Sequence, residues 1–263
     1  MKIRSIALAL AATAALSLGT VSTASAAPAA QQAAKPTIVL LHGAFEDASA
    51  WSKVTQRLQH DGYPVVAPAV PLRGPVPDRD AVKGAVEAIK GPKILVGHSY
   101  GGAIVTELAS GPDVKALVYV AAFIPREGET VGDLNAQFPG SQLGPDTSHT
   151  VESPDGPELF VNTDKFRQVI AADVTAAEAA VGAAGQRPIL ASAFTDKVTT
   201  TAPDSIREYA IVATQDRAIA PAAEEFMAER AHAAITKVRS AHDLPVSHPQ
   251  TVAAVIEKAA TAS

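Results

Sequence analysis

The stretch Gly97-His98-Ser99-Tyr100-Gly101-Gly102 decides how this chain is expected to fold. The apolar segment before it, residues 93–96, is typical of a strand, and the apolar segment after it, residues 103–109, is typical of a buried helix. A serine between two glycines at this spacing forms the G-x-S-x-G nucleophile elbow. In so tight a turn, a Cβ atom at either flanking glycine would collide with neighbouring backbone. The pattern predicts that Ser99 Oγ is presented beside the first amides of the helix. The alternative is a turn that serves packing alone.

The first 26 residues have the pattern of a secretory signal peptide. A basic start is followed by an apolar segment, residues 6–18, and by the small-residue site Ala24-Ser25-Ala26. We expect a secreted protein in which residues 27–35 form a flexible leader. An uncleaved anchor is the alternative, but a membrane span needs about 20 apolar residues. The sequence therefore predicts no stable membrane anchor.

Composition limits the classes of function. The chain has 263 residues, no cysteine and a net charge of −5, which becomes about −7 without the two basic residues of the signal peptide. The remaining length, residues 36–263, suits one domain. Disulfides, thiol catalysis and thiolate metal sites are excluded. Nucleic acid is not expected as a partner because no basic patch is evident. We expect no metal or other cofactor, since neither an H-E-x-x-H motif nor a phosphate-binding P-loop is present.

Strands and helices are predicted to alternate along most of the chain. Continuous apolar segments rich in β-branched residues predict buried strands, and apolar residues at helical spacing predict helices. Such alternation indicates an α/β fold with a mostly parallel sheet covered by helices on both faces. The predicted strands are 36–41, 63–68, 93–96, 114–123, 208–214 and 235–240, and the predicted helices are 50–60, 78–90, 103–109, 221–233 and 249–260.

An insertion of about 80 residues, roughly 125–203, interrupts this alternation. Residues 139–157 are rich in Pro, Gly, Ser and Asp and are predicted to form a loop, whereas 164–172 and 175–185 are predicted to be short helices. The insertion is too long for an ordinary connection, so we interpret it as a small, mobile helical cap over the site. An extra packing layer without a lid function is the alternative.

Four predicted strand ends carry polar residues suited to nucleophilic catalysis: His42-Gly43-Ala44, Ser99, Asp216 and His242. Parallel strands bring such residues to the carboxyl edge of the sheet. A serine hydroxyl needs an imidazole to accept its proton, and the imidazole needs a carboxylate to orient it. The chain order serine, aspartate, histidine is the order expected for an α/β-hydrolase.

The chain resembles the α/β-hydrolases, and within them the small bacterial serine esterases related to plant methyl esterases and hydroxynitrile lyases. The resemblance covers nearly the whole mature chain. It rests on residues 41–45 with Trp51, 97–102, 119–123, 214–219, and 240–242 with 247–249. It implies a triad of Ser99, Asp216 and His242, with the amides of Ala44 and Tyr100 as oxyanion donors. It also implies hydrolysis of small-molecule carboxylic esters through an acyl-enzyme, and it leaves the oligomeric state undefined.

Two histidines compete for the role of base. In the resembling family the catalytic histidine stands seven residues before the proline that opens the last helix, which is the interval from His242 to Pro249. His248 is interpreted as a solvated residue. Asp216 is preferred to Asp243 as the acid, because a residue adjacent to His242 cannot easily fold back onto its Nδ1. Asp243 and Glu225 are interpreted as surface residues.

Other readings stay open. A hydroxynitrile lyase of this group has Lys and Thr where this chain has Asp243 and Gly43, which disfavours that activity. A C–C hydrolase, a haloperoxidase-like enzyme and a catalytically idle ligand-binding relative remain alternatives. Phe45, Phe123 and Phe194 are expected either to line an apolar substrate pocket or to pack in the core.

Overall fold

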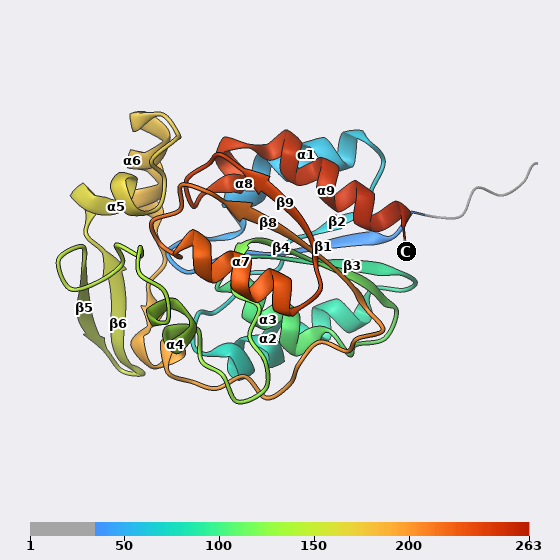
Figure 1. The fold of residues 1–263 in the computed structure, drawn as a ribbon, viewed down its shortest axis with the longest axis horizontal. Coiled ribbons are helices and arrows are strands. Elements are labelled where there is room, and N and C mark those ends of the chain that lie inside the picture. Colours follow the sequence, from blue (N-terminus) through green and yellow to red (C-terminus); the bar gives the residue numbers. More distant parts are fainter. Residues whose placement is uncertain (1–34, 263) are drawn as a thin grey trace, which may run out of the picture. The chain divides into compact units, whose positions relative to one another are not determined.

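The computed structural model describes residues 35–262, so the predicted signal peptide and nearly all of the predicted leader lie outside the described residues. A six-stranded sheet has the order β2-β1-β3-β4-β8-β9, and every neighbouring pair of strands is parallel (Figure 1). Its strands are β1 (Thr37–Leu41), β2 (Val65–Val66), β3 (Lys93–Ser99), β4 (Val114–Ala122), β8 (Arg207–Ala213) and β9 (Ala234–Val238). The predicted parallel sheet is confirmed.

Helices cover both faces of this sheet because its strands are apolar on both sides. Ile38 and Leu40 of β1 pack in one core together with Leu58, whereas Val39 and Leu41 pack in the other together with Val82. On the first face lie η1 (Ala48–Trp51), α1 (Ser52–His60), α8 (Leu244–Ser247) and α9 (Pro249–Thr261). On the second lie α2 (Pro75–Ala88), α3 (Gly101–Leu108) and α7 (Pro221–Arg230).

The edge strand β2 is shorter than predicted. Only Val65 and Val66 pair with β1, although residues 63–68 were expected to form the strand. Pro64 and Pro68 bracket the paired residues, and proline has no amide hydrogen to donate to a ladder.

The insertion between β4 and β8 contains strands as well as helices (Figure 1). The predicted helices are confirmed as α5 (Thr163–Val169) and α6 (Ala176–Gly185). The predicted loop over 139–157 is wrong in its second half, where β5 (Ser148–Ser153) forms an antiparallel hairpin with β6 (Gly156–Val161). The remaining elements are α4 (Val131–Ala136), β7 (Ile189–Leu190), which joins the hairpin in a three-stranded sheet, and η2 (Ala191–Phe194).

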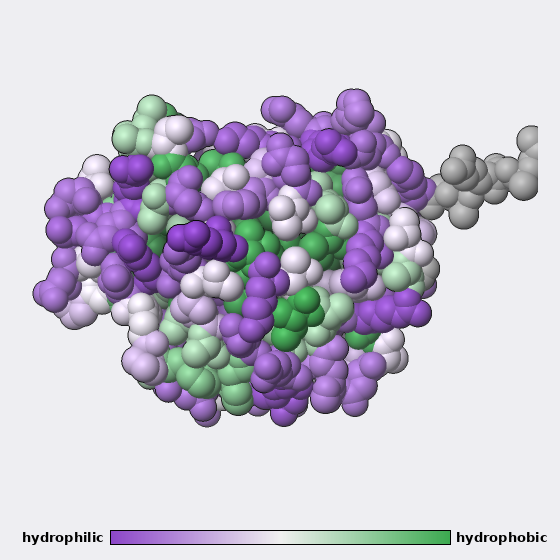
Figure 2. All heavy atoms as spheres, turned by 45° about the horizontal axis from the view of Figure 1, so that its top comes forward, coloured by the Kyte–Doolittle hydropathy of each residue, from purple (hydrophilic) through white to green (hydrophobic). Residues whose placement is uncertain are grey.

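The hairpin could not be predicted from the sequence, because β5 has no buried apolar face and therefore no alternation of apolar and polar residues. Val151 in its middle is exposed. Cross-strand pairing holds it, and its turn uses Gly156 at φ 119°. The face drawn in Figure 2 is covered mostly by hydrophilic residues, with smaller groups of hydrophobic ones between them. Among residues 35–262, none of the helices has the length and apolar character needed to cross a membrane.

Candidate active site

Ser99 is the last residue of β3, and Tyr100 alone separates it from α3. Its φ of 53° lies in the left-handed region, a strained conformation for a residue with a side chain. The turn is possible because glycines flank it. A Cβ atom at Gly97 would lie 2.5 Å from the carbonyl oxygen of Gly101, and one at Gly101 would lie 2.5 Å from the carbonyl oxygen of Leu41. The predicted steric need for both glycines is confirmed.

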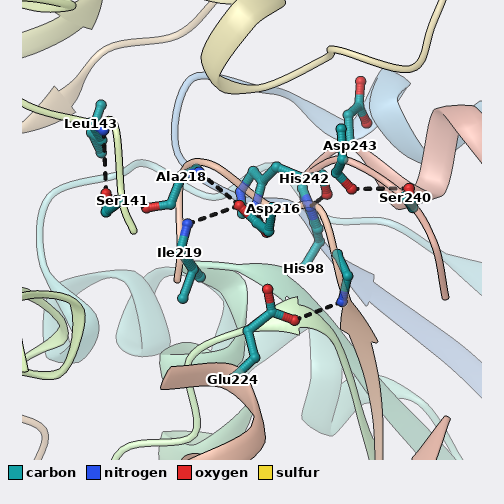
Figure 3. A network of polar contacts seen from close by, with 12 residues as sticks. His98, Ser141, Leu143, Asp216, Ala218, Ile219, Glu224, Ser240, His242 and Asp243 are labelled. Carbon is teal, nitrogen blue, oxygen red and sulfur yellow. Dashed lines mark hydrogen bonds and ion pairs between the residues drawn. The ribbon is translucent and has the colours of Figure 1, made fainter. Parts of the chain in front are cut away.

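Asp216 and His242 meet beyond the ends of β8 and β9 (Figure 3). His242 Nδ1 lies 2.5 Å from Asp216 Oδ2, and both residues are buried. Asp216 Oδ1 accepts the amides of Ala218 at 2.7 Å and Ile219 at 2.9 Å. Three donors therefore surround the carboxylate, and the aspartate orients the ring so that Nδ1 carries a proton and Nε2 can accept one.

Ser99 and His242 line the same small cavity, which has a volume of about 20 Å³. Among the hydrogen bonds of residues 35–262, none joins Ser99 Oγ to His242 Nε2. The cavity has room for about one water molecule. Its other lining residues are Ala44, Phe45, Tyr100, Phe123, Asn135, Leu143, Ile170, Phe194, Ala218 and Ile219. The three aromatic residues expected to face either a pocket or the core thus line this cavity.

Two larger cavities adjoin the first. One of about 700 Å³ lies between α4 and the β5–β6 hairpin and shares Asn135, Leu143 and Phe194 with the small cavity. The other, of about 460 Å³, lies under α6 and shares Phe45 with it. Both larger cavities therefore share lining residues with the small cavity that Ser99 lines.

His98 lies between Glu46 and the backbone of His242, a contact that the sequence did not predict. Its Nδ1 lies 2.9 Å from Glu46 Oε2, and its Nε2 lies 3.0 Å from the carbonyl oxygen of His242. Both ring nitrogens face acceptors, so the ring is doubly protonated. Burial alone lowers the pKa of His98, but the charge and hydrogen bond of Glu46 outweigh burial and raise the pKa to about 9. No local pattern links residues 46 and 98, which lie on different elements.

The interpretation of Asp243 as a surface residue is wrong. Asp243 is buried, and burial followed by the charge of Glu46 raises the pKa of its carboxyl to about 8. It directly precedes α8 as its N-cap, and that helix was not predicted. Glu225 is partly exposed and pairs with Lys237 at 2.9 Å. His248 is also partly exposed and contacts Ser247 Oγ at 2.9 Å.

A second carboxyl group, that of Glu224, is buried close to Asp216 (Figure 3). Its Oε2 accepts the amide of Ala213 at 3.0 Å. Burial first, and then the negative charge of Asp216, raise the pKa of Glu224 well above its usual range. Burial and the neighbouring carboxylate therefore both favour the neutral form of Glu224.

His42 Nε2 accepts the amide of Val70 at 3.0 Å, so this buried ring bonds loop backbone. Within residues 35–262, no group of three or more His, Asp or Glu side chains is arranged to hold a metal ion.

Comparison with known proteins agrees with the fold. The model of the "Alpha/beta hydrolase family" matches residues 38–255. The chain is 35% identical to "Probable hydrolase R7" of Phoma sp. over 115 residues, which are 38% of this chain and 47% of that protein. It is 32% identical to "Carbendazim hydrolyzing esterase" of Nocardioides sp. over 110 residues, 35% of this chain and 44% of that protein. These alignments thus span about half the length of either relative.

The fold is similar to that of a methylesterase from Arabidopsis, with a TM-score of 0.71 and 19% identity over 87% of this chain and 100% of the other. At this level of identity the similarity shows the fold alone. Since the family model covers most of the chain, from β1 to α9, the match and the fold lead to one conclusion. The chain belongs to the alpha/beta hydrolase family.

Proposed function

We propose that this alpha/beta hydrolase is a secreted serine esterase that cleaves carboxylic esters through Ser99, His242 and Asp216. The observation that carries the proposal is the placement of Ser99 on the same cavity as His242, whose other ring nitrogen bonds Asp216. A nucleophile, a base and an orienting carboxylate are the parts that acyl transfer requires.

The reaction proceeds in two halves. Ser99 Oγ attacks the ester carbonyl carbon while His242 Nε2 accepts the hydroxyl proton, and the carbonyl oxygen becomes an oxyanion. The amides of Ala44 and Tyr100, two residues that line the cavity, bind this oxyanion. The C–O bond to the alcohol then breaks, and His242 returns the proton to the departing alkoxide. His242 then deprotonates a water molecule, which attacks the acyl carbon; the bond to Ser99 Oγ breaks, and His242 returns the proton to Ser99 Oγ as the acid is released.

The cavity favours a neutral substrate. Its lining includes no Lys, Arg, Asp or Glu, and Ser99, Tyr100, Asn135 and His242 are its polar members. A charged group placed there would lose its hydration without gaining a counter-charge. The relatives named as a hydrolase and an esterase support hydrolysis as the reaction class.

The decisive experiment compares Ser99→Ala with the unaltered protein in hydrolysis of p-nitrophenyl acetate. We expect activity to fall at least about 10³-fold, because the acyl-enzyme cannot form. Ser205→Ala, at an exposed serine, serves as the matched control and should keep full activity. A fluorophosphonate should label the parent on Ser99, as read by peptide mass. Turnover retained in Ser99→Ala would exclude the mechanism.

Secretion rests on the pattern of residues 1–26. After expression of the full chain in an exporting bacterium, we expect to recover the protein from the culture medium with Ala27 as its N-terminal residue. A protein that stays in the cell with Met1 intact would contradict it.

A further inference from the structure

We propose that Asn135 selects esters that carry an O–H or N–H donor next to the scissile carbonyl, by accepting a hydrogen bond on its Oδ1 atom. The apolar remainder of such a substrate occupies the 700 Å³ cavity between α4 and the β5–β6 hairpin. This inference rests on the proposed esterase function and names the substrate class of that site.

Asn135 stands where the two spaces meet. It belongs to α4 and lines both the small cavity that contains Ser99 and the 700 Å³ cavity. A substrate that enters the larger cavity and presents its carbonyl to Ser99 must pass this side chain. A polar group at that boundary is placed to recognise the part of a substrate next to the reacting bond.

The orientation of the Asn135 amide follows from its neighbour Ser141. The Ser141 hydroxyl donates its proton to the carbonyl oxygen of Ala218 at 2.8 Å, and its oxygen accepts the amide of Leu143 at 3.2 Å (Figure 3). With its proton used, Ser141 Oγ can offer Asn135 only a lone pair. Asn135 therefore turns Nδ2 toward Ser141, at 3.2 Å, and cannot turn Oδ1 there.

The consequence is an unused acceptor. Asn135 Oδ1 is buried and has no hydrogen-bond partner among the described residues. Buried polar atoms without a partner are rare, and each one calls for an explanation. A carbonyl oxygen can only accept, so the missing partner is a donor: a hydroxyl or an amide-type N–H of the substrate, or a water molecule that such a group displaces.

The cavity beyond Asn135 suits an uncharged, apolar group. It includes Phe138, Leu143, Leu159 and Phe194, and none of its lining residues is Lys, Arg, Asp or Glu. An aryl or alkyl chain is therefore the chemistry that fits, with the donor close to the carbonyl. Methyl 3-phenyllactate has this form, and methyl 3-phenylpropanoate is the same ester without the hydroxyl.

The test measures kcat/KM for both esters and takes their ratio, so that the ratio in a variant can be compared with that of the parent. In Asn135→Leu, which has a similar shape but no acceptor, we expect the preference for the hydroxy ester to fall about tenfold, the loss of one hydrogen bond. The kcat/KM for the phenylpropanoate should fall by less than the kcat/KM for the phenyllactate. Gln137→Leu removes an exposed amide at the end of the same helix and should leave the ratio unchanged. Where an ester is not turned over, its inhibition constant against p-nitrophenyl acetate provides the same comparison.

An unchanged ratio in Asn135→Leu would overturn the inference. Equal losses for both esters, repeated in Asn135→Ala, would also overturn it, because they would indicate a structural role of the side chain. Either result leaves the esterase proposal intact, since hydrolysis of p-nitrophenyl acetate and its loss in Ser99→Ala test that proposal separately.

Discussion

His98 donates a hydrogen bond from Nε2 to the carbonyl oxygen of His242, at 3.0 Å, while its Nδ1 lies 2.9 Å from Glu46. The residue before the proposed nucleophile thus holds the backbone of the proposed base. The rings of the two histidines also lie 4.8 Å apart, centroid to centroid. A buried, charged His98–Glu46 pair therefore supports the position of His242 from beneath.

The buried His98–Glu46 pair is expected to stabilise the fold. Glu46→Gln should lower the free energy of unfolding by about 3 kcal/mol at pH 6.5, because it leaves His98 buried without its counter-charge. Guanidinium unfolding measures this change. His60→Gln, at an exposed histidine, is the control and should change stability by less than about 0.5 kcal/mol.

The same pair predicts how stability depends on pH. The folded pKa of His98, about 9, lies above its ordinary value of 6.5, so its contribution is complete below pH 6.5 and is lost as the pH rises through 9. Asp243, raised to about 8, acts in the same direction. The pKa of Glu46 is lowered, so its contribution is lost only in acid. The parent should lose stability between pH 6.5 and 9, and Glu46→Gln should lose less. Equal slopes for the two proteins would contradict the charged pair.

His242 and His248 can be separated by a matched pair of variants. His242→Ala should lower kcat for p-nitrophenyl acetate at least about 10³-fold, because no other group on the cavity can accept the proton of Ser99. His248→Ala should retain activity within about threefold, since His248 does not line that cavity. The reverse result would transfer the role of base to His248.

The two buried carboxyl groups provide a further contrast. Asp216→Asn should lower kcat by roughly 10⁴-fold, because an amide favours the wrong tautomer of His242. Glu224→Gln should change kcat less than about threefold, since the surroundings of Glu224 favour its neutral form and glutamine has nearly its shape. Circular dichroism checks the fold of both variants. A comparable loss in Glu224→Gln would mean that Glu224 carries the functional charge.

The elbow predicts opposite effects for two glycine substitutions. Gly97→Ala should destabilise the protein by more than about 2 kcal/mol, because the new Cβ meets the backbone carbonyl of Gly101. Gly84→Ala should stabilise it by about 0.5–1 kcal/mol, because Gly84 lies inside α2 with no atom within 4 Å of the added Cβ. Thermal unfolding measures both. A rise in Tm for Gly97→Ala would contradict the close approach at the elbow.

The sequence by itself determined the central sheet and the placement of the candidate site residues along the chain. The buried strands are continuous apolar segments, so their positions can be found from the sequence. Once the strands are placed, the residues at their carboxyl ends are known as well. The elbow glycines are required by local sterics. Ser99, Asp216 and His242 could be named for this reason, because each belongs to a local pattern.

Only the tertiary structure decided which distant groups meet. Glu46 pairs with His98, Asp243 becomes buried, β5 pairs with β6, and Ser141 sets the amide of Asn135. No periodic pattern or motif in the sequence predicts these contacts, because the residues that meet are separated along the chain by arbitrary distances. Packing, hydrogen bonding and desolvation in the folded molecule determine them.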